Sequence, residues 1–373
     1  MSGGARMHGL YVGLMSGTSL DGVDAVLLRI DDAGMALRGH VQWPLPAALR
    51  SALDALNRRG DDELHRAHLA ARALADCYAD AVAALLESAA VPAAAVRAVG
   101  AHGQTVRHRP ELGYTVQLNA PARLAERCGI TVVADFRSRD VAAGGQGAPL
   151  VPAFHRAWFG RPGEALAVLN LGGIANVTLL GAAGGAVGFD CGPGNTLLDA
   201  WSQRHLGRPF DAAGEWAAGA EPLPALLAAL LADPYFAAAP PKSTGRDHFH
   251  MEWLQRALDA LPAAPAQRVQ STLAELSARA AADALRAHAH APDVAELLVC
   301  GGGAANDDLM ARLRRLLPEV AVHDSGHRGL PAQQVEGAAF AWLAARALAG
   351  LPGNAPEATG ASGPRVLGAI YPA

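Results

Sequence analysis

The stretch LYVGLMSGTSLDGVDAVLLRI, residues 10–30, consists of two apolar runs with β character on either side of a loop of Gly, Ser, Thr and Asp. This pattern predicts a β-hairpin whose polar loop covers eight residues, from Gly17 to Asp24. A second stretch, EALAVLNLGGIANVTLLG at residues 164–181, again has the order strand, glycine turn, strand. A hairpin that returns near the middle of the chain predicts two lobes built to the same plan.

Strands and helices alternate in the rest of the chain. Apolar residues recur at helical spacing over 47–89, and a buried strand, a triple-glycine turn and an amphipathic helix are expected over 295–317. The alternation predicts an α/β fold of two duplicated lobes with a ligand cleft between them. We expect residues 1–134 and 344–373 in the first lobe and 135–343 in the second, with the last ~20 residues loosely structured.

The composition excludes several classes of protein. The chain has 373 residues, which suggests two domains, and 51% of them are hydrophobic, so a disordered chain is excluded. Its 31 basic and 35 acidic side chains give a net charge of −4, without the basic excess of a nucleic-acid-binding protein. The longest apolar run, residues 222–232, is far shorter than the ~20 residues of a membrane span. We therefore expect neither a nucleic acid nor a membrane as a partner.

The cysteines and the N-terminal stretch indicate the cytoplasm. Cys77, Cys128, Cys191 and Cys300 lie far apart and form no C-x-x-C pair, a spacing that is neither a disulfide framework nor a zinc site. The histidine spacing contains no catalytic zinc motif such as H-E-x-x-H. The apolar stretch 9–15 is too short for a secretory signal and runs directly into the polar turn.

Three glycine-rich turns follow strands, at 17–24, 172–176 and 301–306. A strand that ends in glycine lets backbone N–H groups approach a ligand closely, and grouped N–H groups bind anions such as phosphate. None of the three turns has the spacing of a P-loop or of a dinucleotide-binding motif. A single turn of this kind is usually only a turn, whereas three turns after three strands favour a bound nucleotide. The first two occupy matching places in the repeated hairpins, which suits a nucleotide gripped between the lobes.

Asp190, in GFDCGPGN at residues 188–195, is the candidate catalytic residue. We expect it just after a short apolar strand, with its carboxylate projecting into the space that the lobes enclose. Gly192 and the two residues after it keep bulk away, so this carboxylate is expected to be aimed, poorly solvated and without a structural partner, as a general base needs. The alternative is an aspartate that caps the next helix, although Asn195 and Thr196 lie nearer to that helix and would cap it better.

Two further groups of polar residues have both a functional and a structural interpretation. Asp21 and Asp24 could hold a hydrated Mg²⁺ beside phosphates, or could be turn aspartates bonded to their own backbone. His102, Gln104 and Thr105 follow a strand and could hydrogen-bond a sugar-like ligand, while a lone histidine there is more often a satisfied structural group.

A third group lies around a glycine pair and on a late helix. Arg137 and Gln146 could recognise a carboxylate or a phosphate, whereas Arg139 and Asp140 could simply form a surface ion pair. Glu336, on the late helix, could be a buried polar contact to a ligand or merely exposed.

These motifs together resemble the anhydro-N-acetylmuramic acid kinase family. The matching segments follow the family's order from residue 13 to residue 344, and they include GLMSGTSLDGVDA, LNLGGIANVT, GFDCGPGNTLLDAW, PPKSTGRDHFH and CGGGAANDDLM. The chain departs from the family pattern at Asp247 and His250, which replace an acid and an amide, and at Cys191, where a threonine or serine is commoner.

The resemblance implies the two ribonuclease H-like lobes of the actin, hexokinase and Hsp70-like ATPase superfamily, which clamp ATP. The implied reaction opens the internal bridge of 1,6-anhydro-N-acetylmuramic acid and phosphorylates O6, giving N-acetylmuramic acid 6-phosphate and ADP in peptidoglycan recycling. Asp190 corresponds to the family's catalytic base, which takes a proton from the water that attacks C1. ATP and Mg²⁺ are the implied cofactors, and a homodimer is the implied assembly.

The motifs and the resemblance together assign residues to each ligand. The residues expected at the ATP phosphates are Gly17, Thr18, Ser19, Leu20, Asp21, Gly22, Val23, Asp24, Gly172, Gly173 and Asn176. The residues expected near the adenosine are Gly301, Gly302, Gly303 and Asn306. The residues expected at the sugar are His102, Gln104, Thr105, Arg137, Gln146, Gly192, Asn195 and Glu336. Asp21 and Asp24 are also the expected ligands of Mg²⁺, through water.

Two other functions stay open at this point. One is another sugar or carboxylate kinase of the same superfamily, which would phosphorylate a hydroxyl group without opening a ring. The other is an ATP-switched binding protein, like the actin and Hsp70 branches. That function needs a partner surface or a peptide-binding domain, for which we expect no spare length in this sequence.

Overall fold

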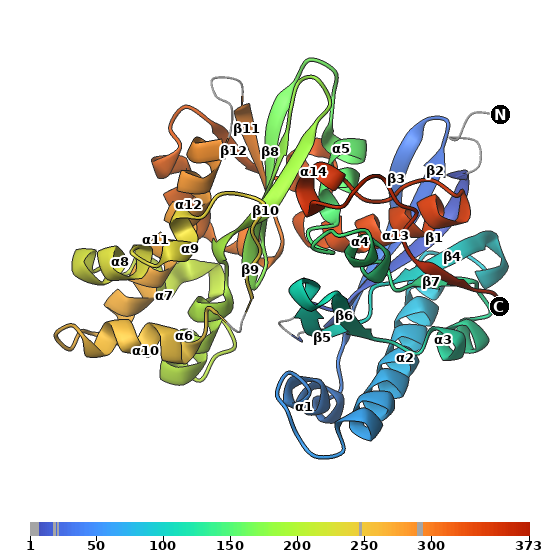
Figure 1. Cartoon of the computed structure of the whole chain (residues 1–373), viewed down its shortest axis with the longest axis horizontal. Coiled ribbons are helices and arrows are strands. Elements are labelled where there is room, and N and C mark those ends of the chain that lie inside the picture. The colour runs from blue at the N-terminus through green and yellow to red at the C-terminus, as the bar shows by residue number, and fades with distance from the viewer. Residues whose placement is uncertain (1–6, 18–19, 21, 246–247, 289–293) are drawn as a thin grey trace. The chain divides into compact units, whose positions relative to one another are not determined.

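The computed structural model describes residues 7–17, 20, 22–245, 248–288 and 294–373. Contacts within the chain divide it into two units (Figure 1). The first unit contains the chain up to Phe154 together with Gln334–Ala373, and the second unit is His155–Gln333. The first unit is therefore discontinuous in sequence, because the second is inserted into it.

The first unit is built on a six-stranded sheet with the order β13-β7-β4-β1-β2-β3. Strands β1, β2 and β3 form an antiparallel meander, β4 and β7 continue the sheet parallel to β1, and β13 pairs antiparallel with β7. The strands are β1 Gly9–Met15, β2 Gly22–Asp31, β3 Gly34–Pro44, β4 Val96–Ala101, β7 Val132–Ala134 and β13 Ala369–Tyr371. A separate hairpin pairs β5 (Gln104–Arg109) with β6 (Tyr114–Leu118).

The second unit repeats this plan in a five-stranded sheet with the order β10-β9-β8-β11-β12. Strands β8, β9 and β10 form an antiparallel meander, and β11 and β12 lie parallel to β8. The strands are β8 Ala165–Leu171, β9 Ile174–Leu180, β10 Ala186–Pro193, β11 Val294–Cys300 and β12 Ala321–Asp324. The shared strand order and directions are those of a ribonuclease H-like lobe, and they confirm the duplicated α/β fold that the two hairpins predicted.

Helices cover both sheets (Figure 1). In the first unit, α2 packs on β2 and β3 while α13 packs on β1 and β4, and in the second unit α11 packs on β9 and β10. The helices of the first unit are α1 Ala47–Ala55, α2 Glu63–Ser88, α3 Pro121–Cys128, α4 Ser138–Ala142, α13 Val335–Leu348 and α14 Pro356–Thr359, and α5 Val151–Phe159 contains the unit boundary. Those of the second unit are α6 Thr196–Leu206, α7 Glu215–Ala218, α8 Pro224–Leu231, α9 Pro234–Ala237, α10 Met251–Asp259, α11 Ala266–His288 and α12 Asp307–Leu316. Among the described residues, no helix combines the length and apolar character that a membrane crossing needs.

Strand β1 is buried on both faces, between α2 and α13. Because successive side chains of a strand point to opposite faces, Val12 and Leu14 join the core that includes α2, and Gly13 points toward α13. A Cβ atom at Gly13 would lie 1.8 Å from the carbonyl oxygen of Gly337. Only glycine allows this close approach, which brings the backbone of α13 directly against the sheet.

The boundaries of the units differ from those expected from the sequence. The sequence places residues 135–154 and 334–343 in the second lobe, whereas in the structure both segments contact the first unit. Phe136 and Phe340, one from each segment, pack ring against ring with their centroids 5.5 Å apart. Because α13 also packs on β1 and β4, the late helix belongs to the first sheet from its beginning.

The C-terminal segment, expected to be loose, is instead built into the first unit around Asp140, which is fully buried. The N–H of Gly147 donates to one carboxylate oxygen of Asp140 at 2.8 Å. The side chains of Asn354 and Thr359 donate to the other oxygen, each at 2.8 Å. The interpretation of Asp140 as half of a surface pair with Arg139 is therefore wrong, because three buried donors depend on its carboxylate.

We expect Asp140→Ala to lower the free energy of unfolding by about 3 kcal/mol, because it leaves three buried donors without their acceptor. Urea unfolding at neutral pH measures the change. Arg139→Ala is the matched control, since the neighbouring Arg139 is exposed and should lose less than about 0.5 kcal/mol. Equal stability of the two variants would contradict the structural role of Asp140.

In the second unit, His155 is a buried histidine outside the candidate site residues. Its side chain is 0% exposed, and its Nδ1 lies 2.9 Å from the hydroxyl of Thr178 on β9. Burial lowers the pKa of His155 to about 3, because desolvation penalises the charged ring. The native protein therefore holds this histidine neutral at pH values where the unfolded chain would protonate it.

The pKa of His155 predicts how stability depends on pH. Below the ordinary histidine pKa, near 6.5, the unfolded chain takes up a proton that the native state does not, so stability falls as the pH falls towards about 3. Replacing His155 by Gln should reduce the slope of unfolding free energy against pH between 6 and 4 by roughly 1 kcal/mol per pH unit. Thermal and urea unfolding across that range measure the slope, with the exposed His65→Gln as control. If the curves of unfolding free energy against pH for His155→Gln and wild type were parallel, the buried ring would not be the source of the pH dependence.

Candidate functional site

In both units, residues predicted to bind ligands follow the carboxyl ends of parallel strands. Gly17 follows β1, His102 follows β4 and Arg137 follows β7 in the first unit. Gly172 follows β8 and Gly301 follows β11 in the second. Ligands of open α/β sheets bind at this edge, where loops leave neighbouring strands side by side. Each unit therefore presents its own set of candidate residues at the equivalent edge of its sheet.

The first hairpin loop is shorter than the sequence predicts. β2 begins at Gly22, so Val23 and Asp24 are strand residues; Val23 is fully buried, and Asp24 pairs with Met15 across the hairpin. The carboxylate of Asp24 lies 3.1 Å from Nε2 of His40 on β3. The loop residues Thr18, Ser19 and Asp21 lie outside the described residues.

The described residues of this loop, Gly17 and Leu20, are joined through their backbones. The N–H of Leu20 donates to the carbonyl of Gly17 at 3.1 Å, and Leu20 is buried with a left-handed φ of 60°. A buried leucine with this φ is strained, which is unusual in an ordinary turn and common at ligand-binding loops.

His102 and Arg137 form one hydrogen-bonded unit at the edge of the first sheet. Nε and Nη2 of Arg137 lie 3.1 and 2.9 Å from Nε2 of His102, and Nη1 donates to the carbonyl of Gly147 at 2.8 Å. Burial, and then the charge of Arg137, lower the pKa of His102 well below its ordinary value. The ring is therefore neutral and accepts from the guanidinium, which it orients. The ring of Phe340 on α13 packs on His102 with the centroids 4.7 Å apart.

The other predicted sugar-binding residues of the first unit lie in different environments. Gln104 is buried, and its Oε1 has no hydrogen-bond partner among the described residues. The hydroxyl of Thr105 accepts from Gln117 across the β5–β6 hairpin at 3.2 Å. The backbone N–H of Gln146 donates to the Thr359 carbonyl at 2.7 Å, so this residue is fixed by the C-terminal segment. Glu336 lies in the first turn of α13 and is half-buried.

In the second unit, three turns that contain glycine lie in close contact, and two of them are joined through their backbones. The carbonyl of Gly172 accepts from the N–H of Asn195 at 2.8 Å, and the carbonyl of Gly173 accepts from the N–H of Gly194 at 3.0 Å. A Cβ atom at Gly194 would lie 2.2 Å from the Gly172 oxygen, and one at Gly303 would lie 2.5 Å from Cβ of Leu171. These glycines are required by the neighbouring backbone, whether or not a ligand is bound.

Two glycines of the same turns have no such close approach. The nearest atoms to a Cβ at Gly172 and at Gly302 would be 3.5 and 3.8 Å away. Asn306, predicted to lie near the adenosine, uses its side-chain oxygen to cap α12 by accepting from the N–H of Leu309 at 3.0 Å. The neighbouring backbone therefore does not require glycine at Gly172 and Gly302, while Asn306 fixes the helix that follows the turn.

Asp190 lies inside β10 rather than just after a strand. The register between β9 and β10 shifts between Asp190 and Gly192, which identifies a bulge at Cys191. Asp190 pairs with Asn176 of β9, and Asn176 pairs in turn with Asn170 of β8. Paired residues of neighbouring strands share a face of the sheet, so these three polar side chains form a row. The buried Oδ1 of Asn176 has no hydrogen-bond partner among the described residues.

The carboxylate of Asp190 has a structural partner, contrary to the expectation from sequence. The N–H of Thr244 donates to its Oδ2 at 3.0 Å, and the N–H of Asp190 donates to the carbonyl of Lys242 at 3.2 Å. The hydroxyl of Tyr235 donates to the Asp190 carbonyl at 2.7 Å. Residues 242–244 therefore run alongside β10 and aim the carboxylate. The buried hydroxyl of Thr244 has no partner among the described residues.

A lysine and a thiol lie close to this carboxylate. Nζ of Lys242 donates to the carbonyls of Tyr235 and Phe236 at 3.1 and 3.4 Å, which anchors the segment that holds Asp190. Burial lowers the pKa of Lys242, and the negative charge of Asp190 partly opposes that shift. Burial raises the pKa of the Cys191 thiol to about 12, and the neighbouring Asp190 charge adds to the shift.

The expected capping roles after β10 are wrong. Neither the side chain of Asn195 nor that of Thr196 caps α6: Asn195 donates to the Leu171 carbonyl at 2.9 Å, and Thr196 donates to the Gly173 carbonyl at 2.7 Å. Both side chains instead bind the turn between β8 and β9. His250 has the capping role on α10, where Nδ1 accepts from the N–H of Trp253 at 3.3 Å, while Asp247 lies outside the described residues.

Asn170 is a residue of this site that is absent from the candidates drawn from the sequence. It was detectable, because it interrupts the otherwise apolar strand ALAVLNL. Lys242 and Thr244 lie in the dense polar stretch PPKSTGRDHFH, whose pattern fits a functional loop and a solvated loop equally well. Their contact with Asp190 joins residues 54 positions apart in the chain, which no local pattern can predict.

The comparisons with known proteins decide the family. A sequence model described as "Anhydro-N-acetylmuramic acid kinase" matches residues 9–373. The chain belongs to the anhydro-N-acetylmuramic acid kinase family. Two relatives of that name, from Variovorax paradoxus (strain S110) and Bordetella petrii, are 59% and 58% identical to it. The matches cover 98% and 100% of this chain and 99% of each relative.

Membership of this family confirms the predicted enzyme class and function. The chain is a kinase, and the family's reaction is the ATP-dependent opening and phosphorylation of 1,6-anhydro-N-acetylmuramic acid in peptidoglycan recycling. The two alternatives, a kinase without ring opening and a non-enzymatic ATP-switched protein, are set aside. Among solved structures, a ROK family glucokinase from Streptomyces griseus matches 90% of this chain and 99% of its own at 16% identity, with a TM-score of 0.42.

The interlocked turns give a prediction about stability. Gly194→Ala should lower the free energy of unfolding by about 3 kcal/mol, because its Cβ would overlap the backbone oxygen of Gly172. Gly172→Ala is the matched control, since the nearest atom to its new Cβ is 3.5 Å away, and it should lose less than about 1 kcal/mol. Urea unfolding measures both. Similar losses in the two variants would mean that the turns are not held together by this close approach.

Proposed function

We propose that Asp190 is the general base in the ring-opening step of this kinase. Its carboxylate takes a proton from water while the water oxygen bonds to C1 of the anhydro sugar and the C1–O6 bond breaks. O6 then carries the electron pair of that bond and accepts the terminal phosphoryl group that ATP supplies. Water is consumed, and the products are N-acetylmuramic acid 6-phosphate and ADP.

The observation that carries this proposal is the way in which Asp190 is held. The N–H of Thr244 donates to one carboxylate oxygen of Asp190 at 3.0 Å, and the bulge at Cys191 directly follows Asp190 in β10. An N–H donor orients a carboxylate, and a carboxylate accepts several hydrogen bonds at once. The aimed, partly buried group can therefore receive the proton of a water molecule.

The second unit offers groups that fit a nucleotide. Gly172 and Gly302 lie in glycine turns that follow strands and are not required there by a close backbone approach, and the unpartnered Oδ1 of Asn176 lies in the polar row next to Asp190. We assign Gly172, Gly173 and Asn176 to the phosphates, and the turn 301–303 to the adenosine, with Asn306 holding α12. The loop from Gly17 to Asp24 in the first unit is the second phosphate-binding segment of the proposal.

The first unit offers groups that fit the sugar. The substrate carries a carboxylate, and a guanidinium held by a neutral histidine and a carbonyl is a suitable partner for it. The unpartnered Oε1 of buried Gln104 can accept from a hydroxyl or amide of the ligand. We assign to the sugar His102, Gln104, Thr105, Arg137, Gln146 and Glu336 of the first unit, and Gly192 and Asn195 of the second.

The proposal also includes Mg²⁺ as a cofactor, a homodimeric assembly and a cytoplasmic location. Mg²⁺ would neutralise the phosphates during transfer, with Asp21 and Asp24 holding it through water. The carboxylate of Asp24 already accepts from His40, so it would act on the hydrated ion from that fixed position. A homodimer follows from the family alone, and the four free cysteines support a cytoplasmic location.

Asp190→Asn tests the base. Asparagine keeps an oxygen for the N–H of Thr244 but cannot take a proton, so kcat should fall about 10²–10⁴-fold while the fold and ATP affinity stay unchanged. Steady-state kinetics, circular dichroism and ATP titration measure the three quantities. Asp259→Asn, on the exposed face of α10, is the matched control. An Asp190→Asn enzyme with more than a tenth of the wild-type kcat would refute the assignment.

The source of the oxygen at C1 tests the coupled reaction. In ¹⁸O-labelled water, the label should appear at C1 of the product and not in its phosphate, when the product is analysed before the anomeric hydroxyl exchanges. N-Acetylmuramic acid without the internal bridge should not be consumed. Label in the phosphate, or phosphorylation of the unbridged sugar at the same rate, would contradict ring opening by water.

A further inference from the structure

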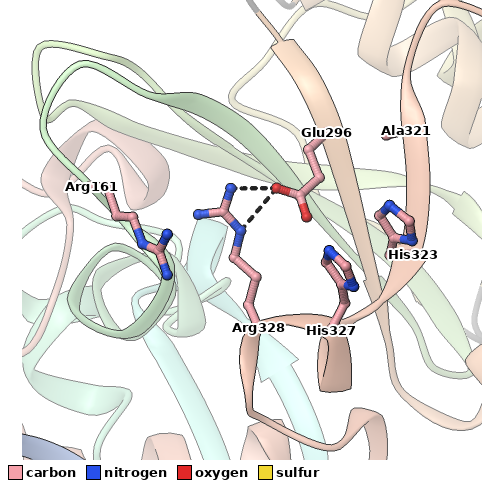
Figure 2. A pocket seen from close by; sticks show the side chains of 6 residues that line it. All are labelled: Arg161, Glu296, Ala321, His323, His327 and Arg328. Atoms are coloured by element: carbon pink, nitrogen blue, oxygen red, sulfur yellow. Dashed lines mark hydrogen bonds and ion pairs between the residues drawn. The ribbon is translucent and has the colours of Figure 1, made fainter.

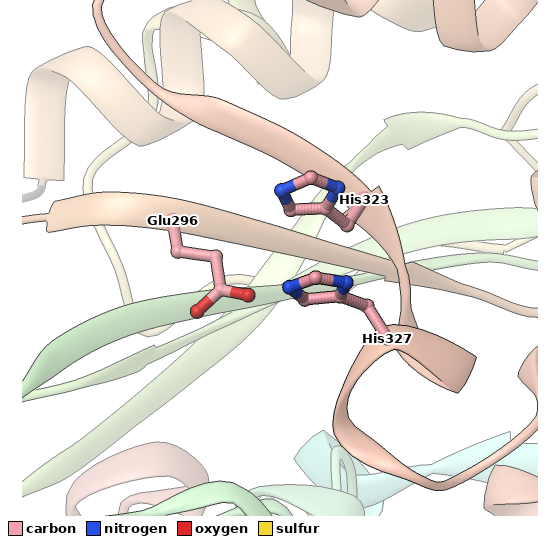
Figure 3. Close-up of side chains that lie close together, drawn as sticks. All are labelled: Glu296, His323 and His327. Carbon is pink, nitrogen blue, oxygen red and sulfur yellow. The ribbon is translucent and has the colours of Figure 1, made fainter.

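Two histidines and a glutamate meet on the second unit, outside the polar row that contains Asp190 (Figure 3). Glu296 lies on β11, His323 on β12, and His327 in the 3₁₀ turn Ser325–Arg328 that follows β12. One carboxylate oxygen and one nitrogen of each ring lie within 4.8 Å of one another. Nothing in the proposed reaction uses these three side chains.

Arg328 forms hydrogen bonds to one oxygen of the Glu296 carboxylate. Nε and Nη2 of Arg328 donate to Oε2 of Glu296 at 2.9 and 2.5 Å, and Nη1 pairs with Glu164 at 2.8 Å. Figure 2 shows the second carboxylate oxygen on the side of His327. A hydrogen bond to one oxygen that leaves the other directed at a metal is the usual support of a carboxylate ligand. Glu296 therefore has a fixed orientation.

The two imidazole rings are stacked, with their centroids 4.0 Å apart and their planes 13° from parallel. A metal ion lies in the plane of each imidazole that binds it, so two stacked rings bind one ion only after at least one of them turns out of the stack. His327 is exposed and has room to do so.

The group lines an open pocket of about 520 Å³, which gives an ion access from solvent (Figure 2). Arg161 and Arg328 also line this pocket, so an anion is the alternative occupant. Arg328 is already paired with two glutamates, and the Glu296 charge repels an anion. The two glutamates offset the two arginines in charge, so the argument for a cation rests on the ligand atoms of Glu296, His323 and His327.

We propose that Glu296, His323 and His327 form a binding site for one divalent transition-metal ion, with Zn²⁺ as the reference ion. Two imidazole nitrogens and one carboxylate oxygen suit a borderline-soft ion, and water completes a tetrahedral shell. Mg²⁺ prefers an all-oxygen shell and does not compete at such a site. The spacing His-x-x-x-His within residues 323–327 is the sequence signal, which a search for H-E-x-x-H does not find.

The site would connect two strands and the turn that follows them. Its ligands come from β11, β12 and the turn 325–328, so a bound ion would tie the edge of the sheet to that turn. The segment after the turn reaches the predicted adenosine-binding turn, since the N–H of Gly301 donates to the Ala332 carbonyl at 2.9 Å. A metal ion here stabilises the second unit without entering the reaction.

Equilibrium dialysis of the tag-free full chain against Zn²⁺ at pH 7.5, in 5 mM Mg²⁺, tests the site. We expect one equivalent of Zn²⁺ per chain, and at least tenfold weaker binding in His327→Ala and in His323→Ala. The exposed His65→Ala on α2 is the matched control and should bind as wild type does. Co²⁺ bound at this site should show visible d–d absorption but no near-ultraviolet charge-transfer band from a thiolate. The missing charge-transfer band would show that the ion is not bound by a cysteine.

A second readout is thermal unfolding. Saturating Zn²⁺ should raise the Tm of wild type and His65→Ala, and leave that of His327→Ala unchanged, because only a ligand of the native state stabilises it. Binding that is equally tight in His327→Ala, no binding above background, or a Tm raised by inorganic phosphate and not by Zn²⁺ would each overturn the proposal.

Discussion

The candidate site of the second unit depends on a close approach between three backbone turns. The turn after β8, the turn before α6 and the turn after β11 lie so near to one another that a single methyl group at Gly194 or Gly303 would overlap its neighbour. The absence of those side chains lets carbonyl and N–H groups of different turns pair directly. This contact fixes the edge of the sheet that carries Gly172 and Gly302. It also explains why so many glycines occur together in the sequence.

The fold of the two units could be predicted from the sequence, because the same hairpin occurs twice and its pattern lies within a short stretch of chain. The two hairpins at residues 10–30 and 164–181 predicted the duplicated lobes, and the strand order of both sheets agrees with them. Motifs with a fixed spacing placed the glycine turns and Asp190 at strand ends, where the loops of neighbouring strands meet. The position of Asp190 was wrong by a few residues, since a bulge in the strand leaves no signature in its composition.

The remaining features depend on contacts between distant parts of the chain. Asp140 gave the pattern of a surface pair with Arg139, yet its partners Asn354 and Thr359 lie more than 200 residues away. Thr244 aims Asp190 through a backbone N–H, and any residue except proline carries one. His102 and Arg137 were each assigned to a ligand, and their bond to each other emerged only from the fold. Sequence patterns thus identified the residues but not the partners that orient them.

The discontinuity of the first unit has a consequence for synthesis on the ribosome. The second unit is a continuous insertion, so all of its strands emerge before Gln334 and it can fold as soon as they are clear. The sheet of the first unit lacks α13, the edge strand β13 and two donors of the Asp140 carboxylate until the last forty residues are made. The second unit can therefore be complete before the first, although most of the first is made earlier. Until α13 is made, the face of β1 and β4 that it covers stays open, and exposed apolar surface of this kind promotes aggregation.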